Sequence, residues 1–445
     1  MRKVRVRVAL AAAGVAVIAT LLGGAFSGGT KANPLAILAA NAAGSPEQQA
    51  LGRLLAGLST GNTAGYVHKL EARVAHRPDD GATLAVLALA YQQRARETGD
   101  PTFYRLSGTA LQRASRAGVP GPLIVQAEAS LANTRHRFER GLRLARHAVR
   151  LDPENGSAYG ALGDALLNLG RYPQAFRVYD RMALRAPGIA SFTRVANARE
   201  LLGRPQAAAE ADELALEAGS PVPENVAWAM VQLGNVRFNA GHLAEAASAY
   251  RRALRRLPAY VHAEAGLARV EASEGGYRTA IARLRRVVGE LPIPAYVILL
   301  GDTLRASGHA DAARREYGLV GTIERLFAAN GVRTELQTAL FDLDHDRNVA
   351  DALQRARIAY RSAPSIYAAD AVAWGLFRVG QCREARAYSR LALRLGTRDG
   401  LVVFHRAMIE RCLGNASAHS WFRRALRINP HFSIVWSPVA RKALG

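Results

Sequence analysis

Three acidic residues at alternate positions are the first candidates for chemistry in this sequence. They are Asp342, Asp344 and Asp346, which are spaced like the first acids of a calcium-binding loop. Such a loop needs Gly after the third acid and Glu eleven residues after the first, but Arg347 and Leu353 occupy those places. Turn formation and helix capping by Asp346 and Asn348 explain the cluster more simply. We therefore predict no metal site here.

Other catalytic signals are scarce. The eleven histidines include no HExxH motif, and no GxxxxGKS/T phosphate loop occurs. The acidic residues Glu210, Asp212 and Glu213 fall within a helical pattern, where we expect a solvated surface. Since no nucleophile, base and orienting partner can be assembled from these motifs, we predict neither an enzyme nor a cofactor.

The strong positive charge has an ordinary explanation. The 445 residues carry a formal net charge of +23, and only four of the 59 cationic residues are lysines. This bias toward arginine, beside abundant Ala and Gly, is typical of a GC-rich genome. Runs such as "RRALRR" (Arg251 to Arg256) have helical spacing, which favours a solvated helix face. No aromatic RNA-binding pattern accompanies them, so we predict no nucleic-acid partner.

The N-terminus predicts export. Four cationic residues among the first seven precede an uncharged apolar run from Val8 to Phe26, as in a signal peptide or a membrane anchor. Two alternatives stay open. The segment is cleaved after Ser27 or Ala42, or it is retained as an anchor that associates with the membrane through residues 8–26. In either case the rest of the chain is expected outside the cytoplasmic membrane, extracellular or in the cell envelope.

A period of about 34 residues organises the rest of the chain. Successive gaps of 34, 34, 37 and 34 residues separate Pro153, Pro187, Pro221, Pro258 and Pro292. Each interval predicts two short amphipathic helices, A and B, joined by a turn that contains glycine. The turn glycines are Gly170, Gly203, Gly241, Gly275, Gly308 and Gly380.

Small residues recur at fixed places within the period. In the stretch Leu233 to Pro258, Gly234 leaves a notch on helix A, Ala246 is its small partner on helix B, and Tyr250 fills the gap toward the next unit. Gly241 ends helix A in a left-handed conformation, and Pro258 ends helix B.

This spacing resembles the tetratricopeptide repeat, which implies an all-α fold, a right-handed α-solenoid of about eleven stacked helical hairpins. After an export segment and linker (1–44) we expect degenerate N-terminal repeats (45–155), well-matched repeats (156–331) and C-terminal repeats (332–445). Two departures are expected: a long turn in "RARETGDPTFYRLSG", and an irregularity near Thr334, where the preceding helix B runs on.

The resemblance also implies an inner groove, lined by A helices, that binds an extended peptide or a helix of a partner protein. The A-helix positions away from the small packing residues would supply the contacts. These are Trp228, Asn235, Phe238, Asn239, Arg269, Asp302, Arg305, Asp370, Trp374, Phe377 and Arg378. The carboxylate clamp of chaperone-binding relatives is not reproduced, so their ligand is not expected here.

The two cysteines fall near the turns of successive units. Cys382 follows Gly380 and Cys412 precedes Gly414, and these units stack side by side. In an oxidising compartment this arrangement predicts a disulfide that clamps the last two repeats. Two small buried apolar residues are the alternative.

Two functions follow from these observations. The first is a non-enzymatic scaffold, exported or membrane-tethered, that binds a protein segment in its groove. The second is a basic surface that binds an anionic cell-envelope polymer or phospholipid. Polyanion binding should fall steeply with salt, whereas peptide capture through aromatic contacts and hydrogen bonds should survive moderate salt.

Overall fold

The computed structural model describes residues 53–445 except 56, 61, 120 and 221. This described part is helical and contains no strand. None of its helices combines the length and the apolar character needed to cross a bilayer. The predicted signal or anchor, residues 8–26, lies outside the described residues.

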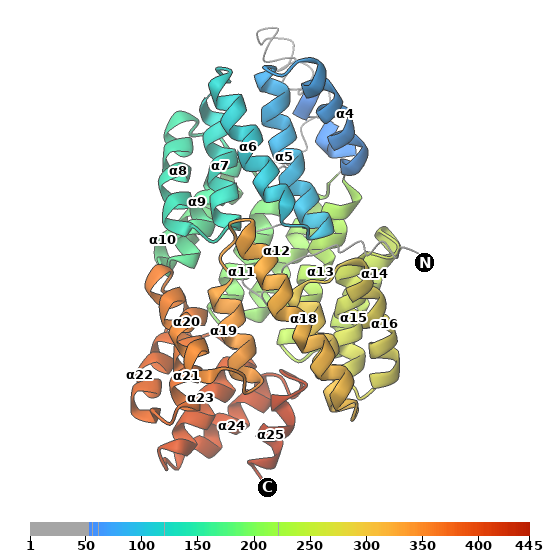
Figure 1. Ribbon diagram of the computed structural model, residues 1–445. Coiled ribbons are helices and arrows are strands. Elements are labelled where there is room, and N and C mark those ends of the chain that lie inside the picture. Colours follow the sequence, from blue (N-terminus) through green and yellow to red (C-terminus); the bar gives the residue numbers. More distant parts are fainter. Residues whose placement is uncertain (1–52, 56, 61, 120, 221) are drawn as a thin grey trace.

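Ten helical hairpins follow one another along the described chain (Figure 1). They pair α5 (Gly81–Thr98) with α6 (Thr102–Arg116), α7 (Gly121–Thr134) with α8 (Phe138–Leu151), α9 (Gly156–Asn168) with α10 (Tyr172–Arg185), α11 (Ile189–Leu201) with α12 (Pro205–Ala218), α13 (Pro223–Asn239) with α14 (Leu243–Arg256), α15 (Val261–Ser273) with α16 (Tyr277–Glu290), α17 (Pro294–Ala306) with α18 (Ala310–Ala329), α19 (Glu335–Asp344) with α20 (Val349–Ser362), α21 (Ile366–Arg378) with α22 (Cys382–Ala392), and α23 (Gly400–Cys412) with α24 (Ser417–Ile428). The 3₁₀ turn η1 (Gly57–Thr60) and α4 (Thr63–His76) precede them, and α25 (Trp436–Lys442) follows.

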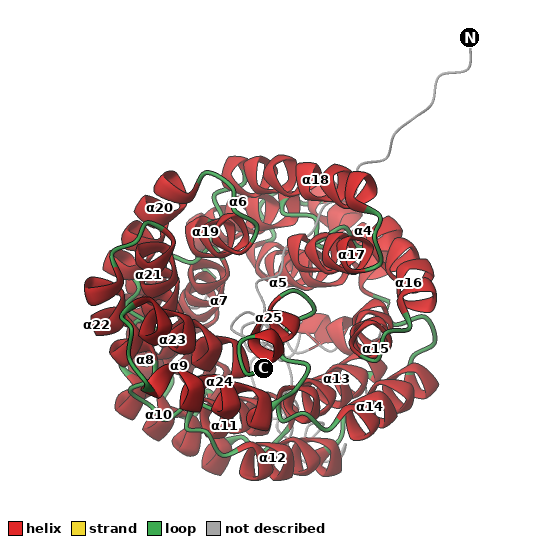
Figure 2. Cartoon of the chain, turned by 90° about the horizontal axis from the view of Figure 1, so that it is seen from below, coloured by secondary structure: helices red, strands yellow, loops and turns green. Residues whose placement is uncertain are grey.

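Each hairpin packs on the next, and each A helix also contacts the A helix of the following hairpin in most of the array. Figure 2 shows the resulting superhelix end-on, with α13, α15 and α17 on the inside and their partners α14, α16 and α18 outside. This α-solenoid confirms the predicted fold class. The division at residues 155 and 331 stays a prediction.

The glycine turns have the predicted conformation. Gly170 has φ +67°, a left-handed value that costs glycine little. Its amide donates to the carbonyl of Leu167 at 3.0 Å, and the amide of Arg171 donates to that of Leu166 at 2.9 Å. These two bonds satisfy the last carbonyl groups of α9, as in a Schellman motif.

Glycine on helix A makes room for the ring of the helix B tyrosine, whereas the sequence predicted close approach of a second helix there and a tyrosine that fills the gap toward the next unit. A Cβ added to Gly234 would lie 2.4 Å from Cε1 of Tyr250, and one added to Gly266 in the next hairpin would lie 2.5 Å from the same atom. Because real Cβ atoms do not approach other atoms so closely, the ring of Tyr250 needs both notches. One fully buried tyrosine thus joins two successive hairpins.

One irregularity is confirmed and one expectation is wrong. Helix α18 runs for 20 residues and α19 for only ten, so the array is irregular where the sequence indicated. The long turn expected in "RARETGDPTFYRLSG" is absent, because α5 continues to Thr98 and α6 begins at Thr102. Gly99 ends α5 in a left-handed conformation with φ +65°, and Asp100 accepts from the amide of Thr102 at 2.9 Å where α6 begins.

Successive turns of the superhelix touch each other, which the repeat pattern did not indicate. The amide of Ile366 donates to the hydroxyl of Tyr172 at 2.7 Å, and Nδ2 of Asn429 donates to the carbonyl of Phe238 at 2.8 Å. The partners lie 194 and 191 residues apart. In Figure 1 the orange and red helices accordingly lie directly below the teal helices α9 and α10.

Candidate functional site

Four of the side chains predicted to face an open groove are buried instead. Trp228, Phe238, Asp370 and Trp374 are exposed by 9%, 1%, 4% and 0% respectively. The A helices pack against their own B helix, against neighbouring A helices and, toward the C-terminus, against α25, so less of their surface remains free than in an open groove. The prediction is corrected for these four residues.

Two polar residues of the predicted groove satisfy tyrosine hydroxyls. Tyr250 donates to Asn235 at 2.8 Å, and Tyr317 donates to Asp302 at 2.7 Å. Tyr179 donates to Asp164 in the same way at 2.9 Å. The signal was in the sequence, because an Asp or Asn follows the notch glycine and precedes the tyrosine by 15 residues in all three hairpins.

Polar bonds also join neighbouring A helices. Asp302 accepts from Nε2 of His345 at 2.7 Å, and Asp370 accepts from Nδ1 of His405 at 2.9 Å. Burial by itself would lower the pKa of His405, but the carboxylates of Asp370, Asp344 and Asp399 together outweigh it and raise that pKa above the ordinary value. These residues hold the inner wall together.

The chain itself covers the inner wall of its last repeats. Trp374 stacks on His405 and Phe377 at centroid distances of 4.1 and 4.8 Å, and its Nε1 donates to Asp344 at 3.0 Å. Trp436 of α25 donates to the same carboxylate at 3.2 Å. Figure 2 shows α25 inside the ring of helices. Trp374 and Phe377 therefore meet, but in a cluster that α25 closes.

The remaining predicted cations differ in their surroundings. Arg378 donates to the carbonyl of Leu343 at 2.9 Å and pairs with Asp346 at 2.5 Å. Arg305 is exposed near the end of α17. Arg269 lies over the ring of Phe238, 3.8 Å from its centroid. Partner binding by these residues stays a prediction.

A row of three aromatic rings, Trp228, His262 and Tyr296, runs along the inner helices α13, α15 and α17. The residues are spaced by 34 along the chain. The centroids of Trp228 and His262 are 5.5 Å apart, and those of His262 and Tyr296 are 6.0 Å apart. His262 and Tyr296 are half-buried. Burial lowers the pKa of His262 to about 4, so this ring is neutral near pH 7.

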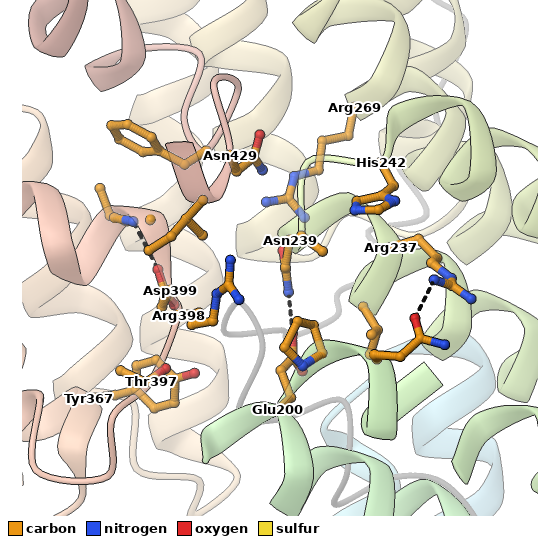
Figure 3. A pocket seen from close by; sticks show the side chains of 18 residues that line it. Glu200, Arg237, Asn239, His242, Arg269, Tyr367, Thr397, Arg398, Asp399 and Asn429 are labelled. Carbon is orange, nitrogen blue, oxygen red and sulfur yellow. Dashed lines mark hydrogen bonds between the residues drawn. The ribbon is translucent and has the colours of Figure 1, made fainter. Parts of the chain in front are cut away.

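A cavity of about 220 Å³ lies between two turns of the superhelix. It contains two residues of the predicted groove, Asn239 and Arg269, and Figure 3 shows both pointing into it. The far side is formed by Thr397 to Leu401, by Asn429 and by Phe432. Sequence reasoning missed these because no local pattern links segments almost 200 residues apart.

Asp212 is a second correction. It was expected on a solvated helix surface, but it is fully buried, and neither carboxyl oxygen has a hydrogen-bond partner among the residues that the structure describes. Burial raises its pKa well above the usual range. Asp212 stands four residues after Ala208, where other hairpins carry a tyrosine such as Tyr250, four residues after Ala246.

The cysteines and the acidic triple are placed as follows. Cys382 and Cys412 form a disulfide with Cα atoms 6.3 Å apart.

Asp342 pairs with Arg355 at 2.5 Å. Asn348 precedes α20 with φ +45° but makes no side-chain capping bond. Among the described residues, no group of His, Cys, Asp or Glu could hold a metal ion.

Comparisons with known proteins give one family match and several similar solved structures. A family model described as a tetratricopeptide repeat matches residues 144–177. Similar solved structures include MamA, with 18% identity and a TM-score of 0.29 over 36% of this chain and 93% of that chain. A tetratricopeptide repeat protein from Parabacteroides merdae ATCC 43184 has 14% identity and a TM-score of 0.40 over 55% of this chain and 98% of that chain. The human IFIT1 dimer with PPP-AAAA has 15% identity and a TM-score of 0.43 over 83% of this chain and 87% of that chain. No curated protein matches the chain.

Proposed function

We propose that this chain, whose residues 144–177 match a tetratricopeptide-repeat model, is a non-enzymatic scaffold that binds a segment of another protein on its inner wall. The partner segment is expected to lie along the inside of α13, α15 and α17. This scaffold acts outside the cytoplasmic membrane, exported or tethered by residues 8–26.

The row of rings formed by Trp228, His262 and Tyr296 is the observation that carries the proposal. His262 and Tyr296 lie on successive inner helices with centroids 6.0 Å apart, so an extended segment that crosses these helices meets an aromatic surface backed by Trp228. Aromatic side chains with polar edges are the residue types that anchor protein interfaces. Trp228 is buried and supports the row, whereas His262 and Tyr296 keep exposed surface for a partner.

Two features support the proposed location. The cationic start and the apolar run to Phe26 have the order of an export signal. The pairing of Cys382 with Cys412 suits an oxidising compartment outside the cytoplasm.

The test is capture of a partner from the cell envelope by the exported part of the chain. We expect His262→Ala combined with Tyr296→Ala to reduce capture at least tenfold at moderate salt, because the exposed rings are removed. Arg256→Ala, at an exposed position on the outer helix α14, is the control and should leave capture unchanged. Circular dichroism of each variant shows whether the array stays folded. Capture that is indifferent to the loss of both rings would refute binding at this row.

A basic outer surface favours the alternative function. Arg251, Arg255 and Arg256 on α14 and Arg285 and Arg286 on α16 are exposed on outer helices. Such a surface would attract an anionic polymer or phospholipid. If binding collapses with salt and with removal of these arginines, but not with removal of the rings, the alternative replaces the first proposal.

A further inference from the structure

The cavity between the turns of the superhelix brings together two guanidinium groups from distant parts of the chain. Arg269 enters it from α15 and Arg398 from the segment Thr397 to Leu401. Figure 3 shows the two groups pointing toward the same space beside Asn239. Two planar forks that converge in this way match the two oxygen atoms of a carboxylate.

Within the part of the chain that the structure describes, neither guanidinium has an ion pair or hydrogen bond to another protein group. The guanidinium of Arg269 lies over the Phe238 ring, and that of Arg398 is exposed to solvent. Arg237, at the edge of the same cavity, differs because it pairs with Glu245 at 3.2 Å. Burial lowers the pKa of Arg269, because partial removal from water disfavours its charged form. A ligand with an opposite charge would therefore be favoured beside it.

The two acidic side chains of the cavity are already engaged. Glu200 accepts from Nδ2 of Asn239 at 2.8 Å. Asp399 accepts from the amide of Leu401 at 2.9 Å and caps the start of α23. Burial raises the pKa of both carboxyl groups above their ordinary values.

Apolar side chains complete the lining. Val236 comes from α13, Leu401 from α23, and Phe432 from the segment that follows α24. Apolar surface beside convergent polar groups is typical of a small-molecule site, although most residues that line this cavity are polar or charged. At about 220 Å³ the space suits a molecule of roughly the size of one aromatic acid, not a folded segment.

We propose that this cavity binds a small organic carboxylate, with its carboxylate between Arg269 and Arg398 and its apolar part against Val236, Leu401 and Phe432. The site is distinct from the aromatic row and does not depend on the proposed capture of a protein. Because Arg269 and Arg398 belong to different turns of the superhelix, the bound ligand bridges the turns. Binding therefore stabilises the contact between them.

Calorimetric titration of the purified exported chain with sodium benzoate tests this assignment. Benzamide is the matched uncharged probe, inorganic phosphate is the alternative anion, and sodium chloride corrects for ionic strength. We expect benzoate to bind and benzamide to bind at least tenfold more weakly. Hydrogen exchange should slow on both sides of the cavity, in residues 236–240 and 397–401.

Two variants locate the site. Arg398→Ala, at an exposed position, and Arg269→Gln should each weaken benzoate binding at least tenfold, and Arg398→Lys should restore it only in part because lysine lacks the planar fork. Arg256→Ala removes the same charge elsewhere and should leave binding unchanged. If benzoate does not bind, if it binds Arg398→Ala as well as it binds the unchanged chain, or if phosphate alone binds, the assignment is overturned. Arg398→Ala keeps the test decisive if Arg269→Gln fails to fold.

Discussion

The hydroxyl of Tyr172 accepts a hydrogen bond from the amide of Ile366 at 2.7 Å, across 194 residues of sequence. Tyr172 begins α10 and Ile366 begins α21, so the bond joins two hairpins that lie one superhelical turn apart. Tyr172 is also buried, at 3% exposure. The turns of this solenoid are therefore in direct contact, and the closed spiral contains a cavity that a single turn could not form.

Tyr172→Phe should loosen this contact. The change removes the acceptor but keeps the ring, and it leaves the amide of Ile366 without its partner, which costs about 1 to 3 kcal/mol. We expect faster hydrogen exchange at Ile366 and a lower midpoint of urea unfolding. Tyr388→Phe is the control, because its hydroxyl makes no hydrogen bond within the described chain. Equal behaviour of the two variants would mean that the contact between turns contributes nothing.

Gly203→Ala should cost more than Gly275→Ala. Both glycines have a positive φ, +69° and +84°, so both substitutions carry the same backbone strain. Only at Gly203 would the new Cβ meet another turn, 2.3 Å from the carbonyl oxygen of Gly396. We expect an extra loss of about 1 to 3 kcal/mol at Gly203, as in overpacked cores, measured by chemical unfolding. Similar losses would show that the turns separate freely.

Asp164→Ala should be strongly destabilising. The carboxylate accepts from Nε and Nη2 of Arg194 at 2.9 and 2.8 Å, and both side chains are 5% exposed. The change strands a buried cation and costs about 3 to 5 kcal/mol. Adding Arg194→Met should recover part of the loss, because the apolar replacement removes the stranded charge. Asp180→Ala, exposed on α10, is the control.

A single Asp164→Ala variant as stable as the Asp180→Ala control would contradict the role of this ion pair. Failure of Arg194→Met to improve the Asp164→Ala variant would show that the loss comes from packing or from the hydroxyl of Tyr179, which also donates to Asp164, and not from the stranded charge.

Asp212→Asn should stabilise the protein at neutral pH. Burial in the folded state raises the pKa of Asp212 well above its unfolded value, so the folded chain binds this proton more tightly than the unfolded chain does. Stability from this group is therefore greatest below the unfolded pKa and falls as the pH rises toward the folded pKa. The neutral amide removes that loss, which amounts to about 1.4 kcal/mol for each tenfold difference in proton affinity between the folded and unfolded chains.

Urea unfolding at several pH values measures this effect. The gain from Asp212→Asn should be larger at pH 7 than at pH 4. Glu217→Gln changes an exposed acid of the same helix and should show no such dependence. A gain that does not change with pH would mean that removal of the buried charge is not its cause.

Replacement of both cysteines by alanine should lower stability. The disulfide between Cys382 and Cys412 closes a loop with a sequence separation of 30, for which the loop-entropy relation gives roughly 3 to 4 kcal/mol. Thermal unfolding of the C-terminal repeats should therefore begin earlier. Peptide mapping without reduction checks the bond directly: one linked pair is expected from the exported protein, and two free thiols would refute it.

The sequence by itself determined the hairpins and their order. The notch at Gly234, the ring of Tyr250 and the left-handed turn at Gly241 recur every 34 residues or so, and each acts between neighbours in the chain. Contacts of this kind are encoded locally, because one repeat packs only on the next. Because successive repeats pack on each other, the sequence also predicted that the turns next to Cys382 and Cys412 lie side by side.

Only the tertiary structure decided what the inner wall offers. Small rotations between hairpins accumulate over the array, and their sum brings Tyr172 to Ile366 and Arg269 toward Arg398, which no local spacing encodes. The same closure, together with α25, buries Trp374. A repeat pattern thus fixes which helices are neighbours, while the accumulated geometry fixes which side chains remain free to bind.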